Sequence, residues 1–138
     1  MTLFVDADSC PVRIREIICR TAQRLHVQAI FVANRSIPIP RNSYCTTIVT
    51  KAEDQAADMY IITYAAQGDM VITRDIPLAK QLVEAHIKVI NDRGVVYTAE
   101  NIDERLSIRN FMYELSINGL APERTKAFGK KEVMEFAQ

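Results

Sequence analysis

The sequence predicts a three-layer α/β/α fold, with a central, mainly parallel sheet of about five strands between two layers of helices. Three observations lead to this prediction. Short β-branched and apolar runs alternate about five times with segments whose apolar residues recur at helical spacing. Such alternation is typical of parallel strands joined by right-handed helical crossovers. The length of 138 residues and the content of 49% hydrophobic and 25% charged residues fit one globular domain.

The first strand is expected at residues 3–5, a short apolar run that ends in a polar turn over residues 6–9. A helix should follow from residue 10 to about residue 26, because a proline stands where a helix start tolerates it and isoleucines recur at helical spacing. Residues 27–33 and 46–50 are two further strand-like runs. The segment between them contains two prolines and two arginines, which predicts an exposed loop.

The same alternation continues in the second half of the chain. The expected elements, in order, are a helix over residues 53–66, a strand over 70–73, a helix over 77–86, a strand over 87–90 and a helix over 101–118. Residues 119–138 would then form a C-terminal tail with a short helix over 130–137. The whole of residues 1–138 is therefore expected to form a single domain.

Charge and cysteine content narrow the functional classes. Seventeen Lys and Arg residues balance 17 Asp and Glu residues, so any contact with nucleic acid must be local rather than driven by net charge. The three cysteines match neither a zinc motif nor a small disulfide scaffold, which favours reduced thiols. The sequence begins without a signal-peptide pattern, and no apolar run is long enough to span a bilayer. We therefore expect a soluble, cytoplasmic protein with no membrane partner.

Carboxylates follow two of the predicted strands. Asp6 and Asp8 come after the first strand, and Asp75 follows the strand over residues 70–73. Ligands of open parallel sheets bind beyond the carboxyl ends of the strands, so these acids would face one small volume if the two strands are neighbours. Asp54 and Asp58 share a face of the next helix, where like charges repel by about 0.2–0.5 kcal/mol. A bound cation would reverse that repulsion.

Oxygen ligands in a chain with only two histidines favour Mg²⁺ or Mn²⁺ over zinc. Such an ion orients a water and neutralises the charge that develops on a scissile phosphate. The sequence therefore predicts a metal-dependent nuclease that cleaves phosphodiester bonds of RNA or single-stranded nucleic acid. The predicted metal ligands are Asp6, Asp8, Asp58 and Asp75, with Asp54 as a weaker member, and the predicted phosphate-binding residues are Arg35 and Arg74.

Each acid also has a purely structural interpretation. Asp8 could cap the first helix, and Asp75 could cap the helix that begins near residue 77. Asp54 near a helix start is favoured by the helix dipole, and Asp69 is expected to be a turn residue. The coincidence of several acids at one edge of the predicted sheet favours a site. The alternative function is a non-catalytic nucleic-acid-binding or regulatory module that keeps the fold without turnover.

Cys10 is a second candidate for chemistry, because a thiolate is stabilised at a helix N-terminus. A phosphatase loop needs an arginine at a fixed distance from its cysteine, and here Arg15 comes one residue too early, in a segment without glycine. We therefore expect no catalytic role for this cysteine.

Three motifs extend over much of the chain. They read VDADSCPV at residues 5–12, DQAAD at residues 54–58 and GDMVITRDIPLA at residues 68–79. Together with NIDERL at residues 101–106, this combination resembles the bacterial YaiI/YqxD family, which is grouped with PIN-like domains.

The resemblance implies a PIN-like fold and a site similar to that of metal-dependent ribonucleases. It implies that Asp6 is the acid of the first strand, that Asp75 is the acid after the Thr-x-Asp strand, and that Asp8 and Asp58 occupy further acidic positions. Met59 stands where the resemblance predicts a second acid after Asp58, and residues 125–128 stand where a Gly-Gly-Pro segment is usual in the family. Tyr64 occupies a position that is acidic in some PIN-like relatives. These departures keep the alternative of a degenerate, non-catalytic site open.

Overall fold

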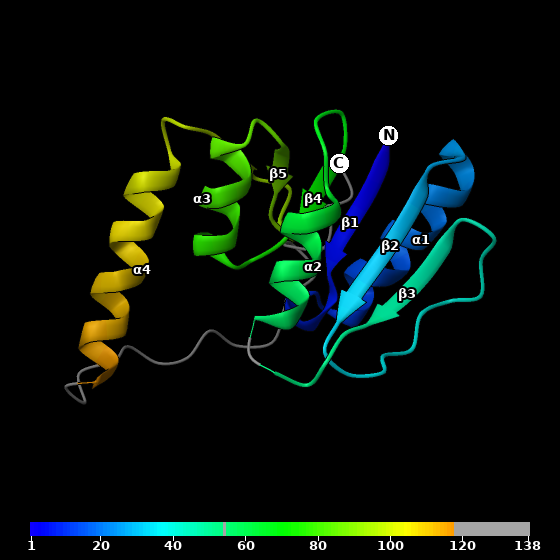
Figure 1. The fold of residues 1–138 in the computed structure, drawn as a ribbon, viewed down its shortest axis with the longest axis horizontal. Helices are drawn as coiled ribbons and strands as arrows, with labels where there is room; N and C mark the ends of the chain where they lie inside the picture. Colours follow the sequence, from blue (N-terminus) through cyan, green and yellow to red (C-terminus); the bar gives the residue numbers. More distant parts are fainter. Residues whose placement is uncertain (54, 118–138) are drawn as a thin grey trace.

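The protein forms one six-stranded sheet in the order β3-β2-β1-β4-β5-β6 (Figure 1). The computed structural model describes residues 1–53 and 55–117. All neighbouring strands are parallel except the β5–β6 pair. The strands are β1 (Thr2–Asp6), β2 (Gln28–Ala33), β3 (Cys45–Val49), β4 (Met70–Ile72), β5 (Lys88–Ile90) and β6 (Val96–Tyr97).

Helices cover both faces of the sheet, which confirms the predicted three-layer α/β/α class (Figure 1). One face is covered by α1 (Val12–Leu25), and the other by α2 (Ala56–Tyr64) and α3 (Ile76–Glu84). The last described helix, α4 (Ile102–Ile117), packs against α3. No helix in these described ranges has the length and apolarity needed to cross a membrane.

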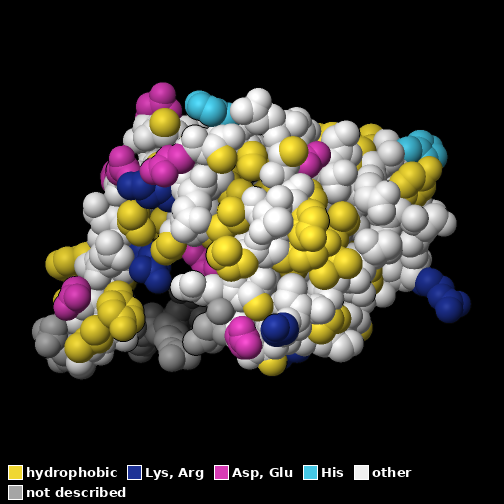
Figure 2. Space-filling view, viewed as in Figure 1, with side chains coloured by type: hydrophobic (Ala, Val, Ile, Leu, Met, Phe, Trp, Pro, Cys, Tyr) yellow, Lys and Arg dark blue, Asp and Glu magenta, His cyan; other side chains and the backbone are white. Residues whose placement is uncertain are grey.

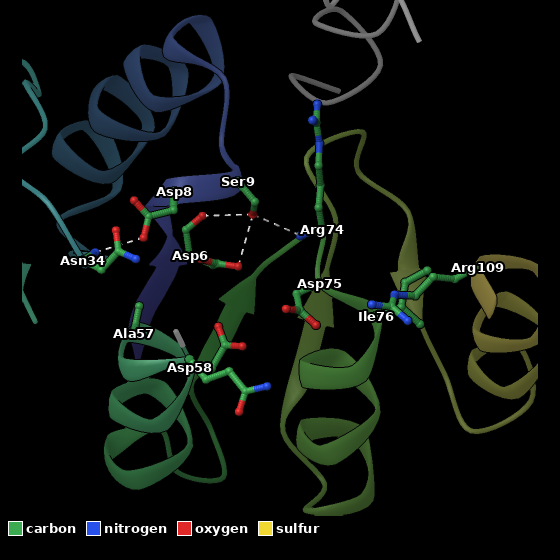
Figure 3. Close-up of a pocket in the computed structure, with 11 residues that line it drawn as sticks. Asp6, Asp8, Ser9, Asn34, Ala57, Asp58, Arg74, Asp75, Ile76 and Arg109 are labelled. Atoms are coloured by element: carbon green, nitrogen blue, oxygen red, sulfur yellow. Dashed lines mark hydrogen bonds between the residues drawn. The ribbon is translucent and has the colours of Figure 1, made fainter. Parts of the chain in front are cut away.

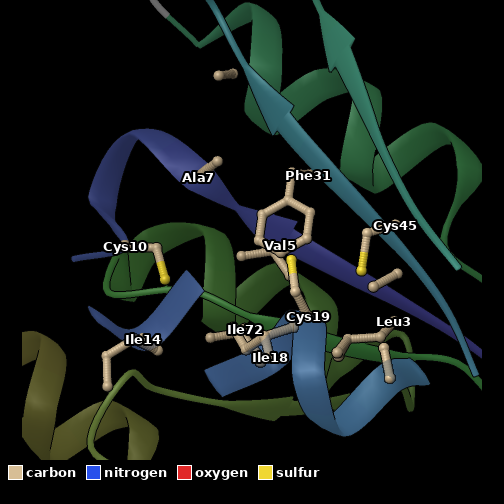
Figure 4. Packing of buried hydrophobic residues seen from close by; sticks show 13 residues of the cluster. Leu3, Val5, Ala7, Cys10, Ile14, Ile18, Cys19, Phe31, Cys45 and Ile72 are labelled. Atoms are coloured by element: carbon tan, nitrogen blue, oxygen red, sulfur yellow. The ribbon is translucent and has the colours of Figure 1, made fainter. Parts of the chain in front are cut away.

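The central strand β1 is buried on both faces because its side chains alternate between two apolar layers. Leu3 and Val5 pack into the cluster under α1, together with Phe31 and three buried cysteines (Figure 4). Phe4 points to the opposite cluster, under α2 and α3, with Val71 as its partner on β4. By the same alternation, Asp6 belongs to the α2 side at the end of the strand.

The sequence-based prediction was wrong about some element boundaries and did not include one strand. The first helix begins at Val12 instead of residue 10, because Ala7–Ser9 form a 3-10 turn, η1, before Pro11. β6 has only two residues and was not predicted, since so short a run shows no periodicity. The expected tail over residues 119–138 and its helix over 130–137 lie outside the described residues, as does Asp54.

The strand order places a topological switch point between β1 and β4. The chain leaves β1 toward β2 and β3 on one side of the sheet, and it returns to β4 on the other side. The connections after β1 and β4 therefore diverge, and a crevice forms beyond the carboxyl ends of these two strands.

Candidate functional site

A pocket of about 490 Å³ opens at this switch point (Figure 3). It is lined by all four predicted acids, Asp6, Asp8, Asp58 and Asp75, and also by Arg74 and Arg109. The acids come from the end of β1, from η1, from the first turn of α2 and from the start of α3. The fold thus brings together carboxylates that are far apart in the sequence.

Asp6 is the most buried of these acids, with 5% of its surface exposed. Its Oδ2 accepts a hydrogen bond of 2.7 Å from the Thr73 hydroxyl and one of 3.1 Å from the Ser9 hydroxyl. Burial raises the pKa of Asp6 in spite of these two bonds, and the neighbouring Asp75 and Asp8 raise it further. The carboxylate of Asp6 is therefore desolvated, and its hydrogen-bond donors are neutral hydroxyl groups.

Asp75 is the N-cap of α3, as the structural interpretation predicted. Its Oδ1 accepts a hydrogen bond of 3.0 Å from the backbone N–H of Leu78. Its own backbone N–H donates to the Thr73 hydroxyl, at 2.9 Å. Capping and a place in the pocket coexist, because the cap fixes one carboxylate oxygen while the side chain lines the cavity.

Asp58 lies in the first turn of α2, where its carboxyl group faces Asp75 across the pocket (Figure 3). Partial burial raises the pKa of Asp58 to about 7, and the charges of Asp75 and Asp6 add to the effect. A hydrogen bond with Asp75 also favours the protonated form of Asp58. Without a cation, Asp58 therefore tends to keep its proton up to near neutral pH.

Asp8 does not cap the first helix, so that structural interpretation is wrong. The N-cap position of α1 is Pro11, and no side chain caps this helix. Instead, the Asp8 Oδ2 accepts a hydrogen bond of 2.9 Å from the backbone N–H of Asn34. Its Oδ1 lies 3.7 Å from Nε of Arg35, whose side chain is 74% exposed. Asp8 thus fixes the loop after β2 to the end of β1, and Arg35 lies beside it near the pocket.

Arg74 has a carboxylate partner that the sequence did not reveal. Its Nε and Nη2 lie 2.7 and 2.6 Å from the same oxygen, Oδ2 of Asp92, a residue that is 3% exposed. Asp92 follows β5 without any motif, so only the pairing of β4 with β5 brings the two residues together. Arg109 was likewise not proposed for the site, although it lines the pocket from α4.

The donor set of the pocket fits a hard divalent cation, since it consists of carboxylate oxygens. Within residues 1–53 and 55–117, no group of three or more His, Cys, Asp or Glu side chains is arranged as a metal site. Binding an ion would therefore require the carboxylates to turn toward a common point. Cys10 is no alternative nucleophile, because burial, with the nearby Asp92 charge, raises the pKa of its thiol to about 12.

These features define an α/β protein with a carboxylate-lined pocket at the switch point of its sheet. The chain belongs to the YaiI/YqxD family, since the model of the family described as "Uncharacterized BCR, YaiI/YqxD family" matches residues 4–138. This confirms the resemblance inferred from the motifs.

Relatives match over almost the whole chain. A UPF0178 protein of Treponema pallidum is 58% identical over 137 residues, which are 99% of this chain and 77% of the relative. A UPF0178 protein of Treponema denticola is 55% identical over 99% of this chain and 87% of its own length. One of Syntrophobacter fumaroxidans is 47% identical over 99% of this chain and 90% of its own length. No solved structure matches the chain.

Replacing Arg74 with methionine should lower the free energy of unfolding by about 1–3 kcal/mol, because the buried Asp92 would lose its cationic partner. The side chain of Arg74 is 46% exposed, so the loss should be smaller than for a fully buried ion pair. Urea unfolding measures the effect, with Arg20→Met, on the exposed side of α1, as the control. The double variant with Asp92→Asn should recover part of the loss. Wild-type stability of Arg74→Met would contradict the structural role of the pair.

The raised pKa of Asp58 predicts a specific pH dependence of stability. An aspartate whose pKa rises from 3.8 in the unfolded chain to about 7 in the fold contributes stability below pH 4, and this contribution is lost as the pH rises through 7. The asparagine in Asp58→Asn does not ionise, so the stability of this variant does not fall in this way. Between pH 5 and pH 8 in EDTA, its free energy of unfolding should therefore increase by about 1–2 kcal/mol relative to that of the wild type, a value reduced for solvent screening. Urea unfolding at four pH values measures this difference, and parallel pH profiles would contradict the assignment.

Proposed function

We propose that this protein is a metal-dependent nuclease that hydrolyses phosphodiester bonds of RNA or single-stranded nucleic acid. The proposed Mg²⁺ or Mn²⁺ ligands are Asp6, Asp8, Asp58 and Asp75. The observation that supports this most is the convergence of four carboxylates from separate segments on one pocket, where the charges of Asp75 and Asp8 raise the pKa of both Asp6 and Asp58. Such an arrangement is costly for the free protein, and it is typical of sites that bind a cation.

When bound, the ion would supply charge neutralisation at the phosphate and an activated water. The residues of the chain would position the reaction. The Thr73 hydroxyl holds Asp6, and the Leu78 backbone N–H holds Asp75, so both carboxylates are oriented before an ion arrives. Arg109, which lines the pocket, and Arg35, which lies beside Asp8 but outside the pocket lining, are the proposed contacts for neighbouring phosphates. Arg74, paired with Asp92, would act mainly by holding the ends of β4 and β5.

We also propose that the protein works in the cytoplasm. All three of its cysteines are free and buried, as expected for a reducing compartment.

The second candidate function is a non-catalytic nucleic-acid-binding or regulatory module. Two observations favour it. The carboxylates of the described residues are not arranged around one point as metal ligands, and the chain has no net charge to attract a polyanion. The two candidates differ in whether the pocket binds a divalent cation and in whether a bound strand is cleaved.

Manganese should stabilise the wild-type protein and raise its thermal midpoint by several degrees. At an ion concentration 100-fold above the Kd, binding to the native state alone adds about 2.7 kcal/mol to the free energy of unfolding. Asp6→Asn and Asp75→Asn should abolish the shift, because each removes a proposed ligand. Glu16→Gln, which removes an exposed acid on α1, should leave it unchanged. An unaltered midpoint of the wild type at 10 mM Mn²⁺ would reject the metal site.

Labelled single-stranded RNA and DNA should be cut by the wild type in Mn²⁺ or Mg²⁺ and left intact in EDTA. Loss of a ligand in Asp75→Asn should lower the cleavage rate by at least about 100-fold, since metal binding and orientation fail together. The same preparation of Glu16→Gln serves as the matched control for contaminating nuclease. Binding of the strands without cleavage in either metal would instead support the regulatory module.

A further inference from the structure

A second pocket, of about 510 Å³, lies on the outer side of α2. Its lining includes Lys51, Gln55, Met59, Tyr60 and Tyr64, which we call the tyrosine shelf. Figure 2 shows hydrophobic side chains gathered over α2 in the middle of this face of the molecule. Met59 and Tyr64 are 58% and 61% exposed, so this pocket presents two large side chains with apolar surface to solvent.

The two tyrosines of the shelf form a pair that holds an aromatic face toward solvent. They stand four residues apart on α2, so their side chains are neighbours on the helix surface. Their ring centroids are 4.6 Å apart, with the planes inclined by 40°. Tyr60 also packs against the buried cluster under α2, so the ring next to the exposed Tyr64 is held by the core.

The tyrosine shelf adjoins the acid pocket at one residue. Gln55, just before α2, lines both cavities, while Asp58 in the first turn of α2 faces the acid pocket. Tyr64 lies six residues after Asp58, which is about 9 Å along the helix axis and, at about 100° per residue, about 120° around it. A strand with one phosphate at the acids would pass Gln55 and follow the helix surface, so the base on the shelf would belong to a nucleotide further along the same strand.

We propose that the tyrosine shelf binds an unpaired nucleobase of the same strand whose phosphate lies at the acid pocket. Stacking requires an uncovered base face, which a single strand presents and the interior of a duplex does not. Lys51 lies in the same pocket and would contact the adjoining phosphate. Glu53 also lines this pocket, so the pocket as a whole carries no net charge. A flat, uncharged base fits such a surface. This inference rests on the proposed function, which identifies the ligand as a nucleic acid. It adds a physical reason why the bound nucleic acid would be single-stranded.

The test measures binding without cleavage. Full-length wild-type protein is titrated in Ca²⁺, a hard cation that carboxylates bind, with a fluorescein-labelled, ten-nucleotide single-stranded RNA, and the fluorescence anisotropy gives the Kd. Gel electrophoresis after each titration verifies that the RNA is intact. Tyr64→Ala should weaken binding about 5- to 100-fold, the range expected for loss of one base–aromatic contact. Tyr64→Phe should stay within about twofold of the parent, since it keeps the ring. Tyr113→Ala, on α4, removes another exposed tyrosine and should have no effect.

Abasic substitutions along the RNA locate the stacked base. One abasic position should weaken binding to the parent as much as Tyr64→Ala does, and it should have no further effect on the Tyr64→Ala protein. Absence of RNA binding by the parent, equal affinities of the parent and Tyr64→Ala, or an equal loss in Tyr113→Ala would each overturn the proposal. Because the assay needs no turnover, a protein that binds the strand without cleaving it gives the same outcome, so failure of the nuclease activity and failure of this proposal are distinguishable. Thermal unfolding of each variant verifies that it is folded.

Discussion

The pairing of β1 with β4 is the constraint on which the site depends. The two strands are parallel neighbours, and the hydrogen bond from Thr73 to Asp6 connects their ends across 67 positions of sequence. The same hydroxyl accepts a hydrogen bond from the backbone N–H of Asp75, so one threonine positions acids from both strands. Because the connections diverge at this point, the crevice between them admits α2 and its Asp58.

Two buried acids at this edge of the sheet differ in how their charge is compensated. Asp92 receives two short contacts from the guanidinium group of Arg74, as expected for an acid that serves the fold. Asp6 receives only the hydroxyl groups of Thr73 and Ser9, and its pKa is raised by burial and by neighbouring acids. An acid left in this state is a candidate for binding a cation, because the two hydroxyl groups offset only part of its desolvation.

The features that could be predicted from the sequence are those that depend on residues close together in the chain or on general rules of sheet geometry. The fold class followed from alternating periodicities, and the acids at strand ends followed from the geometry of parallel sheets. The pairing of Arg74 with Asp92 could not be predicted, because it needs the register of β4 against β5. The role of Asp8 in fixing the loop at Asn34 needs the pairing of β1 with β2 in the same way. The residues of the tyrosine shelf are close together in the sequence, but their position next to the acid pocket, with Gln55 in both linings, could be seen only in the folded chain.

Two of the departures from the expected pattern bear on whether the acid pocket is degenerate. The resemblance predicts an acid at Met59, and some PIN-like relatives suggest one at Tyr64, yet neither residue lines the acid pocket. On a helix with 3.6 residues per turn, Met59 points about 100° away from Asp58, and Tyr64 lies about 1.7 turns beyond Asp58 and about 120° around the axis from it. Acids at these positions would therefore lie over the shelf and not among the proposed ligands. Their replacement by apolar side chains removes negative charge from the surface where a base is proposed to stack, and it leaves the donors of the acid pocket unchanged.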